Sequence, residues 1–595
     1  MNLEKIKATA RLLNEAFGHY KSKIIIMAVA GFVGGLLGGI GIGAIIPLFS
    51  FVVNQQNGTI DNISKFIQKL FSFLHLGYNL PALIILISLL FVAKALFGFF
   101  ANYISARITA DYERDARNNL LKRTLAAKWP YLLEQKVGHL ETILITDTNR
   151  SSGLLDTLSS IILFTTSLLA YSIVALNISA SITLITLGFG VILFFILKPL
   201  LYRTRKMSQQ WAESSKVVAN QVGESVIGSK TIKVMAAENK ILAKIQKYFN
   251  DLYEARLKIV IYSNLQSSFQ EPLSLILVIG IFVFSYSRPG FQFASFLAVI
   301  YLVQKIFSFM QSIQSRLGSV NETSPFLRSV VEYDKQASRN IEEEHRATNN
   351  FDFQRALEFK DVRFYYNDDK KILSGINFEI RKGSMVGLIG PSGAGKTTIV
   401  DLLLKLFKPS AGAITLDGTD ISEINTASWR KNIGYVSQDI FLLSDTIENN
   451  IKFYDPSISD QDMIEAAKMA NIYDVIQEQP NKFSAVVGER GVKFSVGQRQ
   501  RIVLARILAR KPKLLVLDEA TSALDNESEA LIQKTLTDLK EKTTILIIAH
   551  RLSTVMNCDQ LIVLENGTIV EQGTPQNLLN DSSSYFHRTY NIAGK

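Results

Sequence analysis

The fold of the C-terminal half of this chain is decided by Met385-Val-Gly-Leu-Ile-Gly390-Pro-Ser-Gly-Ala-Gly395-Lys396-Thr397-Thr398. A short apolar run, typical of a buried strand, leads into a glycine-rich loop and then a helix start. The loop matches G-x-x-x-x-G-K-[ST], in which glycines let backbone N–H groups point at phosphate oxygens and the helix adds its positive end. The stretch therefore predicts a phosphate-binding loop inside an α/β domain.

The side chains of this P-loop have expected tasks in binding a nucleoside triphosphate. Lys396 would reach the β and γ phosphates of ATP, and Thr397 would bind Mg²⁺. The expected nucleotide contacts along the loop are Gly390, Pro391, Ser392, Gly393, Ala394, Gly395, Lys396, Thr397 and Thr398.

A second motif downstream has the Walker B arrangement, Lys513-Leu-Leu-Val-Leu-Asp518-Glu519. An apolar strand that ends in two acids places both carboxylates at the nucleotide edge of a sheet. Asp518 would hold the Mg²⁺ shell, and Glu519 would orient and polarise the attacking water as the catalytic carboxylate. Two surface acids of no function would be unusual directly after an aliphatic strand.

Further residues resemble those of the ABC superfamily. Gln438, in Tyr435-Val-Ser-Gln438-Asp439, resembles the Q-loop glutamine that joins Mg²⁺ to the membrane-domain interface. His550 resembles the switch histidine at the γ phosphate, and Asp525, in Ser522-Ala-Leu-Asp525, resembles the D-loop acid. Tyr366 looks like the aromatic residue that stacks on adenine. The resemblance implies catalytic roles for Lys396, Gln438, Glu519 and His550, and a metal contact for Gln438 beside Thr397 and Asp518.

The ABC signature motif reads Phe494-Ser495-Val496-Gly497-Gln498-Arg499-Gln500, against the usual Leu-Ser-Gly-Gly-Gln. In this family Ser495, Gly497 and Gln498 would complete the ATP site of a partner subunit. Val496 departs from the pattern, and we interpret it as a tolerated variant. The segment before it, Val487-Gly-Glu489-Arg-Gly491, resembles the X-loop of exporters.

The N-terminal half is predicted to cross a membrane six times, because a helix needs about 20 apolar residues to span the hydrocarbon core. The expected spans lie near residues 24–53, 80–110, 153–175, 178–202, 264–287 and 291–316.

Basic residues give the orientation of these spans. Lys and Arg number five before the first span, seven in 111–150 and eleven in 201–262, whereas the other side carries Lys65, Lys69 and Arg288. The positive-inside rule then places both termini and the ATPase domain in the cytoplasm of a multi-pass inner (cell) membrane protein. The same distribution explains the net charge of +11 and excludes nucleic acid as the expected partner.

The spans carry two unusual sets of residues. Gly31, Gly35, Gly39 and Gly43 recur every four residues, which favours close helix packing over a role with substrate. Lys94 and Lys305 lie mid-way through the second and sixth spans, where an unpaired charge is costly. They would either pair with Glu271 or form a cationic patch for the phosphate head of a lipid-like substrate.

Six spans with long cytoplasmic helical extensions resemble the membrane domain of ABC exporters. In that family the tips of the inner loops dock on the ATPase domain, and the expected tips lie near 146–150 and 229–234. The expected fold is thus an α-helical six-span transmembrane domain (1–320), a linker (321–356) and an α/β P-loop ABC ATPase domain (357–595).

The family also implies the assembly and the activity. ATP lies between the P-loop of one subunit and the signature motif of another, so this half-transporter is expected to act as a homodimer. The expected function is ATP-driven export or flipping of an amphiphilic lipid, because residues 41–48 look like those of flippases for glycolipids and lipid-linked oligosaccharides. The alternatives are a multidrug exporter and, more remotely, an ATP-gated channel or regulatory subunit.

Overall fold

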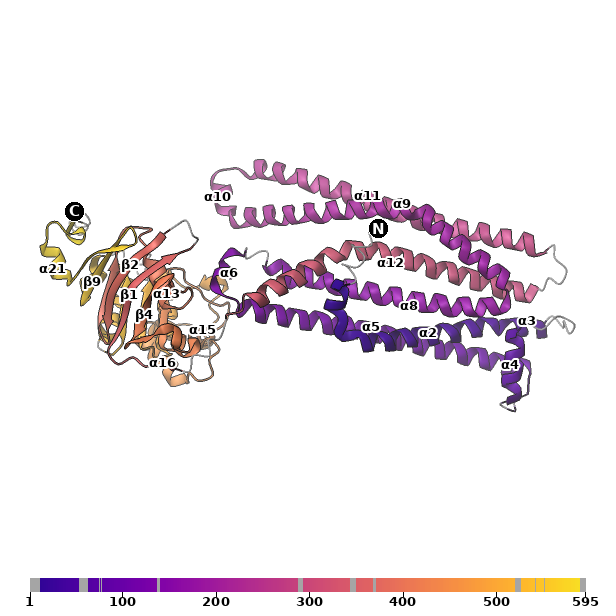
Figure 1. Ribbon diagram of the computed structural model, residues 1–595, viewed down its shortest axis with the longest axis horizontal. Coiled ribbons are helices and arrows are strands. Elements are labelled where there is room, and N and C mark those ends of the chain that lie inside the picture. Colours follow the sequence, from indigo (N-terminus) through magenta and orange to yellow (C-terminus); the bar gives the residue numbers. More distant parts are fainter. Residues whose placement is uncertain are drawn as a thin grey trace. The chain divides into compact units, whose positions relative to one another are not determined.

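The computed structural model of the chain consists of two compact units, which are described separately (Figure 1). It describes residues 11–52, 62–73, 75, 77–135, 140–286, 293–342, 349–366, 371–518, 526–540, 542–549 and 552–588. The first unit comprises Met1–Ala127 and Leu132–Ile341, and the second comprises Lys128–Tyr131 and Glu342–Lys595. The boundary at Ile341 falls inside the segment 321–356 assigned above to the linker.

The first unit is built of long helices that run side by side (Figure 1). α2 packs against α5 and α8, α8 packs against α12, and α9 pairs with α11. The helices are α2 (Lys21–Gly43), α3 (Ile45–Val52), α4 (Asn62–Phe73), α5 (Leu80–Leu125), α6 (Trp129–Glu134), η2 (Thr142–Asp147), α8 (Thr148–Ile178), α9 (Ala180–Ile227), α10 (Ser229–Val234), α11 (Glu238–Tyr286) and α12 (Phe293–Arg339).

Within the described residues, five of the six predicted spans correspond to helices long and apolar enough to cross a membrane: Arg11–Phe49, Leu80–Leu125, Thr142–Ile178, Ala180–Ile227 and Phe296–Val320. The predicted span 264–287 corresponds to a shorter apolar stretch, Pro272–Val283, within α11. Only Ser179 separates α8 from α9, in agreement with the short gap between the predicted spans 153–175 and 178–202. Residues 287–290, at the junction of the predicted spans 264–287 and 291–316, lie outside the described residues.

The glycines of α2 form two rows rather than one. A Cβ on Gly31, Gly35 or Gly39 would lie 2.7–2.8 Å from side chains of α8, and one on Gly38 would lie 2.5 Å from the Tyr171 hydroxyl. Gly34 and Gly41 face α5, where a Cβ on either would lie 3.4 Å from a side chain. Helix packing is thus confirmed for Gly31, Gly35 and Gly39 of the predicted row, and the adjacent glycines line the contact with a second helix.

The two predicted loop tips have different outcomes. The tip near 229–234 is the short helix α10 between α9 and α11, as expected. The tip near 146–150 is wrong, because those residues belong to the helical segment formed by η2 and α8. The turn after α5 instead holds α6, which begins at Trp129 and has Pro130 in its first turn, where the missing N–H removes no helical hydrogen bond.

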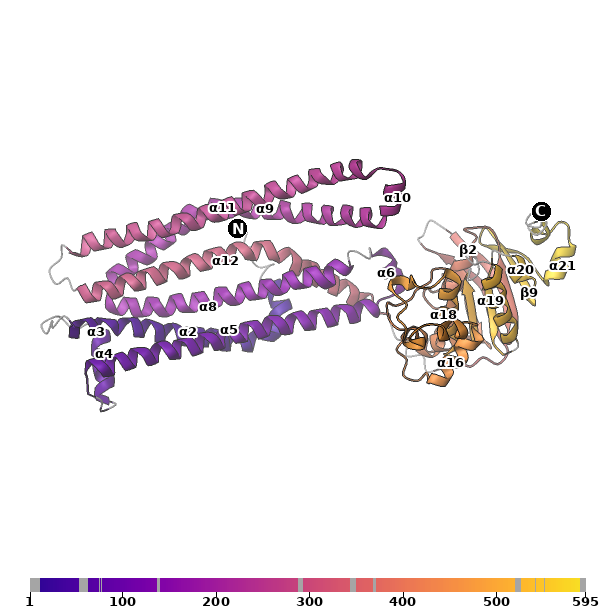
Figure 2. The same cartoon turned by 180° about the vertical axis from the view of Figure 1, so that it is seen from behind.

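The second unit is an α/β domain with two sheets (Figure 2). The antiparallel sheet has the order β2-β1-β4-β5, and the mainly parallel sheet has the order β10-β9-β3-β8-β7-β6. The strands are β1 (Ala356–Tyr365), β2 (Lys371–Arg381), β3 (Met385–Ile389), β4 (Ala411–Leu416), β5 (Thr419–Asp420), β6 (Ile433–Val436), β7 (Leu514–Asp518), β8 (Thr544–Ile548), β9 (Gln560–Glu565) and β10 (Thr568–Gly573).

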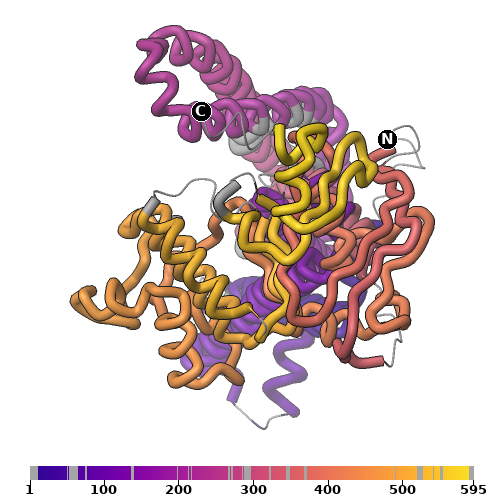
Figure 3. The backbone as a smooth tube through the Cα atoms, turned by 90° about the vertical axis from the view of Figure 1, so that its left-hand side faces the viewer, coloured from indigo at the N-terminus to yellow at the C-terminus, as the bar shows by residue number. Residues whose placement is uncertain are grey.

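Helices flank these sheets. In Figure 3 the orange segment that holds α15 to α18 lies on one side of the strands, and the red strands β1 and β2 lie on the other. The helices are α13 (Lys396–Leu403), α14 (Thr426–Asn432), α15 (Ile447–Lys452), α16 (Asp460–Met469), α17 (Tyr473–Gln477), α18 (Val496–Leu508), α19 (Asn526–Leu539), α20 (Leu552–Val555) and α21 (Pro575–Asn580).

The central strands β3, β7 and β8 are buried along their whole length, as expected for parallel strands covered on both faces. Hydrophobic clusters fill both sides of the parallel sheet. Because β8 pairs with both β3 and β7 in parallel, the P-loop after β3 and Asp518 at the end of β7 emerge from the same edge.

Candidate functional site

The P-loop connects β3 to α13 through three glycines with positive φ, namely Gly390, Gly393 and Gly395. A Cβ on Gly390 would lie 2.0 Å from the carbonyl oxygen of Leu564, and one on Gly395 would lie 2.7 Å from the Leu373 side chain. Only glycine fits this path, which confirms the predicted strand, loop and helix.

The Lys396 side chain is held inside the curve of this loop. It is 6% exposed, and Nζ donates hydrogen bonds to the carbonyl oxygens of Gly390 (2.9 Å) and Pro391 (3.0 Å). Thr397, the next residue, is exposed. The loop thus presents a cation and a hydroxyl at the start of α13, an arrangement suited to a polyphosphate and its metal ion.

Asp518 ends β7 in a buried, polar environment that contains two residues not predicted from the sequence. The Tyr435 hydroxyl of β6 donates a hydrogen bond to Asp518. Burial, together with the charge of Asp518, raises the pKa of Asp401 on α13 to about 6. Two carboxyl groups on neighbouring elements therefore create a negative site beside the P-loop helix, and hard oxygen donors of this kind suit Mg²⁺.

Tyr366, which resembles the aromatic residue that stacks on adenine, lies next to the P-loop. Its hydroxyl is 3.2 Å from the Thr398 hydroxyl, and its ring contacts Phe364 and Phe407 edge-on, with centroids 4.9 and 5.3 Å away. The side chain is 47% exposed. An exposed ring supported by two aromatic neighbours can stack on a flat ligand.

The signature motif forms the N-terminus of α18. Ser495 is the N-cap, with its hydroxyl accepting from the Gln498 amide (3.2 Å), while the Gln498 side chain accepts from the Ser495 amide (3.0 Å). Ser495 and Val496 are exposed and Gly497 is buried. Because Val496 points outward, it leaves this capping box intact.

α18 is anchored to the segment after Gln438 by a buried cation. Arg506 donates to the carbonyl oxygens of Asn450 (2.6 Å) and Phe441 (2.9 Å) and to the Asn450 side chain (3.0 Å). Desolvation lowers the pKa of Arg506 to about 10. Asn450 also bonds both backbone groups of Leu443. No sequence prediction included Arg506 or Asn450, since nothing local distinguishes Arg506 from the other two arginines of α18.

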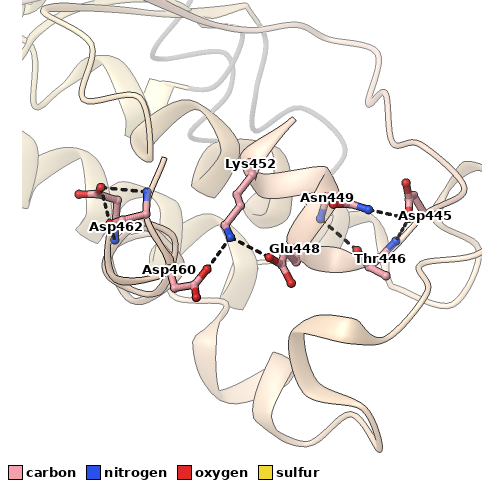
Figure 4. Close-up of polar contacts among 8 residues, drawn as sticks. Asp445, Thr446, Glu448, Asn449, Lys452, Asp460 and Asp462 are labelled. Atoms are coloured by element: carbon pink, nitrogen blue, oxygen red, sulfur yellow. Dashed lines mark hydrogen bonds and ion pairs between the residues drawn. The ribbon is translucent and has the colours of Figure 1, made fainter. Parts of the chain in front are cut away.

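α15 (Ile447–Lys452), which contains Asn450, is fixed at its surface by an ion-pair chain (Figure 4). Lys452 Nζ lies 2.7 Å from Glu448 and 2.5 Å from Asp460 of the next helix. Thr446 caps α15 by accepting from the Asn449 amide. Gln438 itself is exposed. The predicted residues Glu519, Asp525 and His550 lie outside the described residues.

The two intramembrane lysines converge on one tyrosine of α8. Lys94 Nζ of α5 lies 5.8 Å from the Tyr171 ring and 5.6 Å from the Phe91 ring. Lys305 of α12 interacts electrostatically with Tyr171 and lies over Tyr301 (5.6 Å). Tyr171 is 1% exposed. The side chain of Glu271, the ion-pair partner considered above, lies outside the described residues.

A P-loop ATPase fold joined to a bundle of membrane-spanning helices defines the class of an ATP-driven membrane transporter. Two family models agree: "ABC transporter transmembrane region" matches residues 25–313, and "ABC transporter" matches residues 373–522. The chain belongs to the ABC transporter family, as a half-transporter with one membrane region and one ATPase domain.

Known relatives and structures are consistent with this assignment. The chain is 36% identical over 391 residues to an ATP-dependent lipid A-core flippase of Desulfotalea psychrophila, which covers 64% of this chain and 67% of that protein. A Staphylococcus aureus protein provisionally named a multidrug export ATP-binding/permease protein is 46% identical over 232 residues, 39% of this chain and 40% of its own length. The structure of a bacterial Atm1-family ABC exporter with ATP bound superposes with a TM-score of 0.74 at 25% identity, covering 96% and 98% of the two chains. The chain is thus an ABC exporter that couples ATPase activity to transport.

Proposed function

We propose that this exporter flips an amphiphilic lipid with an anionic head, a glycolipid or lipid-linked oligosaccharide, across a bacterial inner membrane. The convergence of Lys94 and Lys305 on Tyr171 carries this proposal, because it gathers two cations and a hydroxyl at membrane depth. The lipid A-core flippase relative supports the same substrate class. The resemblance to the multidrug-export relative covers 232 residues, and the family models match both domains without naming a substrate.

The ATPase residues have the following proposed roles. Lys396, the P-loop glycines and Tyr366 bind ATP, while Ser495, Gly497 and Gln498 contact the ATP of a second subunit. Thr397, Asp518 and Gln438 would hold Mg²⁺, which neutralises phosphate charge when bound; the Asp401–Asp518 carboxyl pair supports this fit. Glu519 would orient water, and His550 and Asp525 would complete the site. The domains we propose are 1–320 and 357–595.

Transport would follow from dimerisation of two identical chains with their ATPase domains in the cytoplasm. Each ATP would be enclosed by both subunits, so that binding closes the pair and shifts the membrane helices from inward-facing to outward-facing. Hydrolysis would reopen the pair and reset the cycle.

ATPase turnover in lipid nanodiscs tests this proposal. Adding lipid-linked sugars or glycolipids should raise turnover more than amphiphilic drugs do, and Lys396→Ala should abolish it. Lys94→Ala and Lys305→Ala should reduce substrate-stimulated turnover at least tenfold more than basal turnover, since each removes a charge from a site of low dielectric constant. Lys198→Ala, at a lysine of α9, is the matched control. Equal loss of basal and stimulated turnover would contradict a substrate site at these lysines.

A further inference from the structure

The helix α4 differs in direction from every long helix of its unit. It connects α3 to α5, and Figures 1 and 2 show it turned across the end of the bundle. Its 12 residues are too few to cross a membrane. A helix placed in this way between two spans runs along a membrane surface rather than through it.

One side of α4 is packed against its own unit. Ile67 (0% exposed) and Phe71 (3%) belong to the same hydrophobic cluster as Leu83 of α5 and Tyr171 of α8. The two residues are four apart, so they share one helical face. This contact fixes how α4 is rotated about its axis.

The rotation leaves two aromatic side chains uncovered by the chain itself. Phe66 is 54% exposed and Phe73 is 79% exposed, and their spacing of seven residues places both on one face. At 100° per residue this face borders the one that holds Ile67. The apolar surface of α4 therefore extends beyond its contact with the unit.

The charged residues of α4 lie on the far side of this aromatic face. Lys65 and Lys69 are both exposed and are four residues apart, so they form one cationic stripe. The helix contains no acidic residue between Asn62 and Phe73. A basic stripe next to exposed aromatic rings is typical of helices that lie in the lipid–water interface.

We propose that α4 lies in the interface of the outer leaflet, with Phe66 and Phe73 among the acyl chains and Lys65 and Lys69 at the phosphates of anionic lipids. The assignment to the outer leaflet rests on the orientation proposed above. Because α4 lies between the span 11–49 and the span in α5, the lipid surface would be continuous with the face that Phe66 and Phe73 present. A second protein chain on this face would instead have to bury two unpaired lysine charges or exclude them.

Spin labels on the full-length chain test this placement. Cys558→Ala removes the only natural cysteine, after which Phe66→Cys, Phe73→Cys and Ser72→Cys each receive a nitroxide. In phosphatidylcholine vesicles that contain phosphatidylglycerol, the labels at 66 and 73 should be accessible to oxygen and protected from a water-soluble nickel complex. The label at 72, on the polar side, should show the reverse. Labels at 66 and 73 that are open to nickel, or shielded from both reagents by protein, would overturn the proposal.

The role of the lysines is tested by removing the anionic lipid. Without phosphatidylglycerol, nickel accessibility at position 73 should rise at least twofold. The double substitution Lys65→Gln and Lys69→Gln should abolish this dependence, whereas Lys122→Gln, at the other end of α5, should preserve it. If nickel accessibility at position 73 did not depend on phosphatidylglycerol in the chain that retains Lys65 and Lys69, headgroup binding by these lysines would be refuted. Label accessibility does not require transport, so this result stands apart from the identity of the flipped substrate.

Discussion

Asp401 is a residue of the ATPase site whose ionised form the fold destabilises. It is on α13, directly behind the P-loop, and burial together with Asp518 raises its pKa from 3.8 to about 6. The folded state binds the Asp401 proton more tightly than the unfolded chain does. The free energy of unfolding is therefore highest with respect to this group below about pH 4, and it falls as the pH rises to about 6.

We therefore expect Asp401→Asn to stabilise the metal-free protein at pH 7.5 by up to about 3 kcal/mol, the free energy that corresponds to this pKa shift. The gain should shrink towards pH 5, where Asp401 is already mostly protonated. Thermal unfolding of the full-length protein at both pH values measures the effect. Asp538→Asn, at an exposed position of α19, should change the melting temperature little at either pH. A gain independent of pH would contradict the argument.

Arg506 is a second residue whose effect depends on burial. Its three hydrogen bonds join α18 to the segment 441–450. Arg506→Met would remove the arginine donors from the backbone oxygens of Phe441 and Asn450, so we expect a loss of about 2–4 kcal/mol of unfolding free energy. Arg510→Met, at a half-exposed pair 3.8 Å from Asp455, should cost less than about 1 kcal/mol. Denaturant unfolding that ranks the two variants in the opposite order would disprove the anchoring role.

At the scale of elements, α2 is held between α5 and α8 because its glycines remove side chains from both contacts. The closest approaches involve the backbone as well as side chains: a Cβ at Gly35 would lie 2.8 Å from the Ala170 Cβ and 3.2 Å from the Ser167 Cα. α8 cannot relieve such contacts by moving one flexible side chain.

Gly35→Ala should accordingly lower the unfolding free energy by about 1–3 kcal/mol, as in other overpacked contacts. Gly188→Ala on α9 is the control, because its Cβ would have nothing within 4 Å in the chain. That change should be neutral or stabilise the helix by up to about 1 kcal/mol. Thermal unfolding in detergent distinguishes the two substitutions. Equal melting temperatures would argue against close packing at Gly35.

At the scale of the whole molecule, the proposed nucleotide site would be shared by two subunits, with Thr397 in the P-loop half and Ser495 in the signature half; both residues are exposed. Lys396→Ala should inactivate the P-loop half, and Ser495→Ala should weaken the signature half. Neither homodimer would then have a complete site. A mixed dimer would contain one complete site. It would be formed by the intact P-loop of the Ser495→Ala chain and the intact signature motif of the Lys396→Ala chain.

Coexpressing these two variants with different affinity tags, and purifying the doubly tagged dimer, should therefore give ATPase turnover at least severalfold above either parent homodimer. A dimer in which one chain carries both substitutions and the other is unchanged has the same composition but no complete site, and it should stay inactive. Equal turnover in the two mixed dimers would refute shared sites.

The sequence by itself determined the ATPase half and, within the described residues, five of the six predicted apolar helices. The P-loop, the Walker B strand and the signature helix could be predicted because each is a contiguous motif. The roles predicted for Lys396, Asp518 and Ser495 depend on backbone conformations that a few neighbouring residues specify. Pro130 was also a local signal for the first inner turn, although the prediction placed that turn at 146–150.

Only the tertiary structure decided which distant residues meet. Asp401 and Tyr435 reach Asp518 because β3, β8, β7 and β6 are adjacent in the sheet, and strand order is not encoded in any single strand. Lys94 lies beside Tyr171 because the glycines of α2 allow α5 and α8 to approach it closely. The pKa of Asp401 and the exposed aromatic face of α4 likewise depend on burial by residues far away in the chain, since desolvation and packing arise from contacts rather than from sequence spacing.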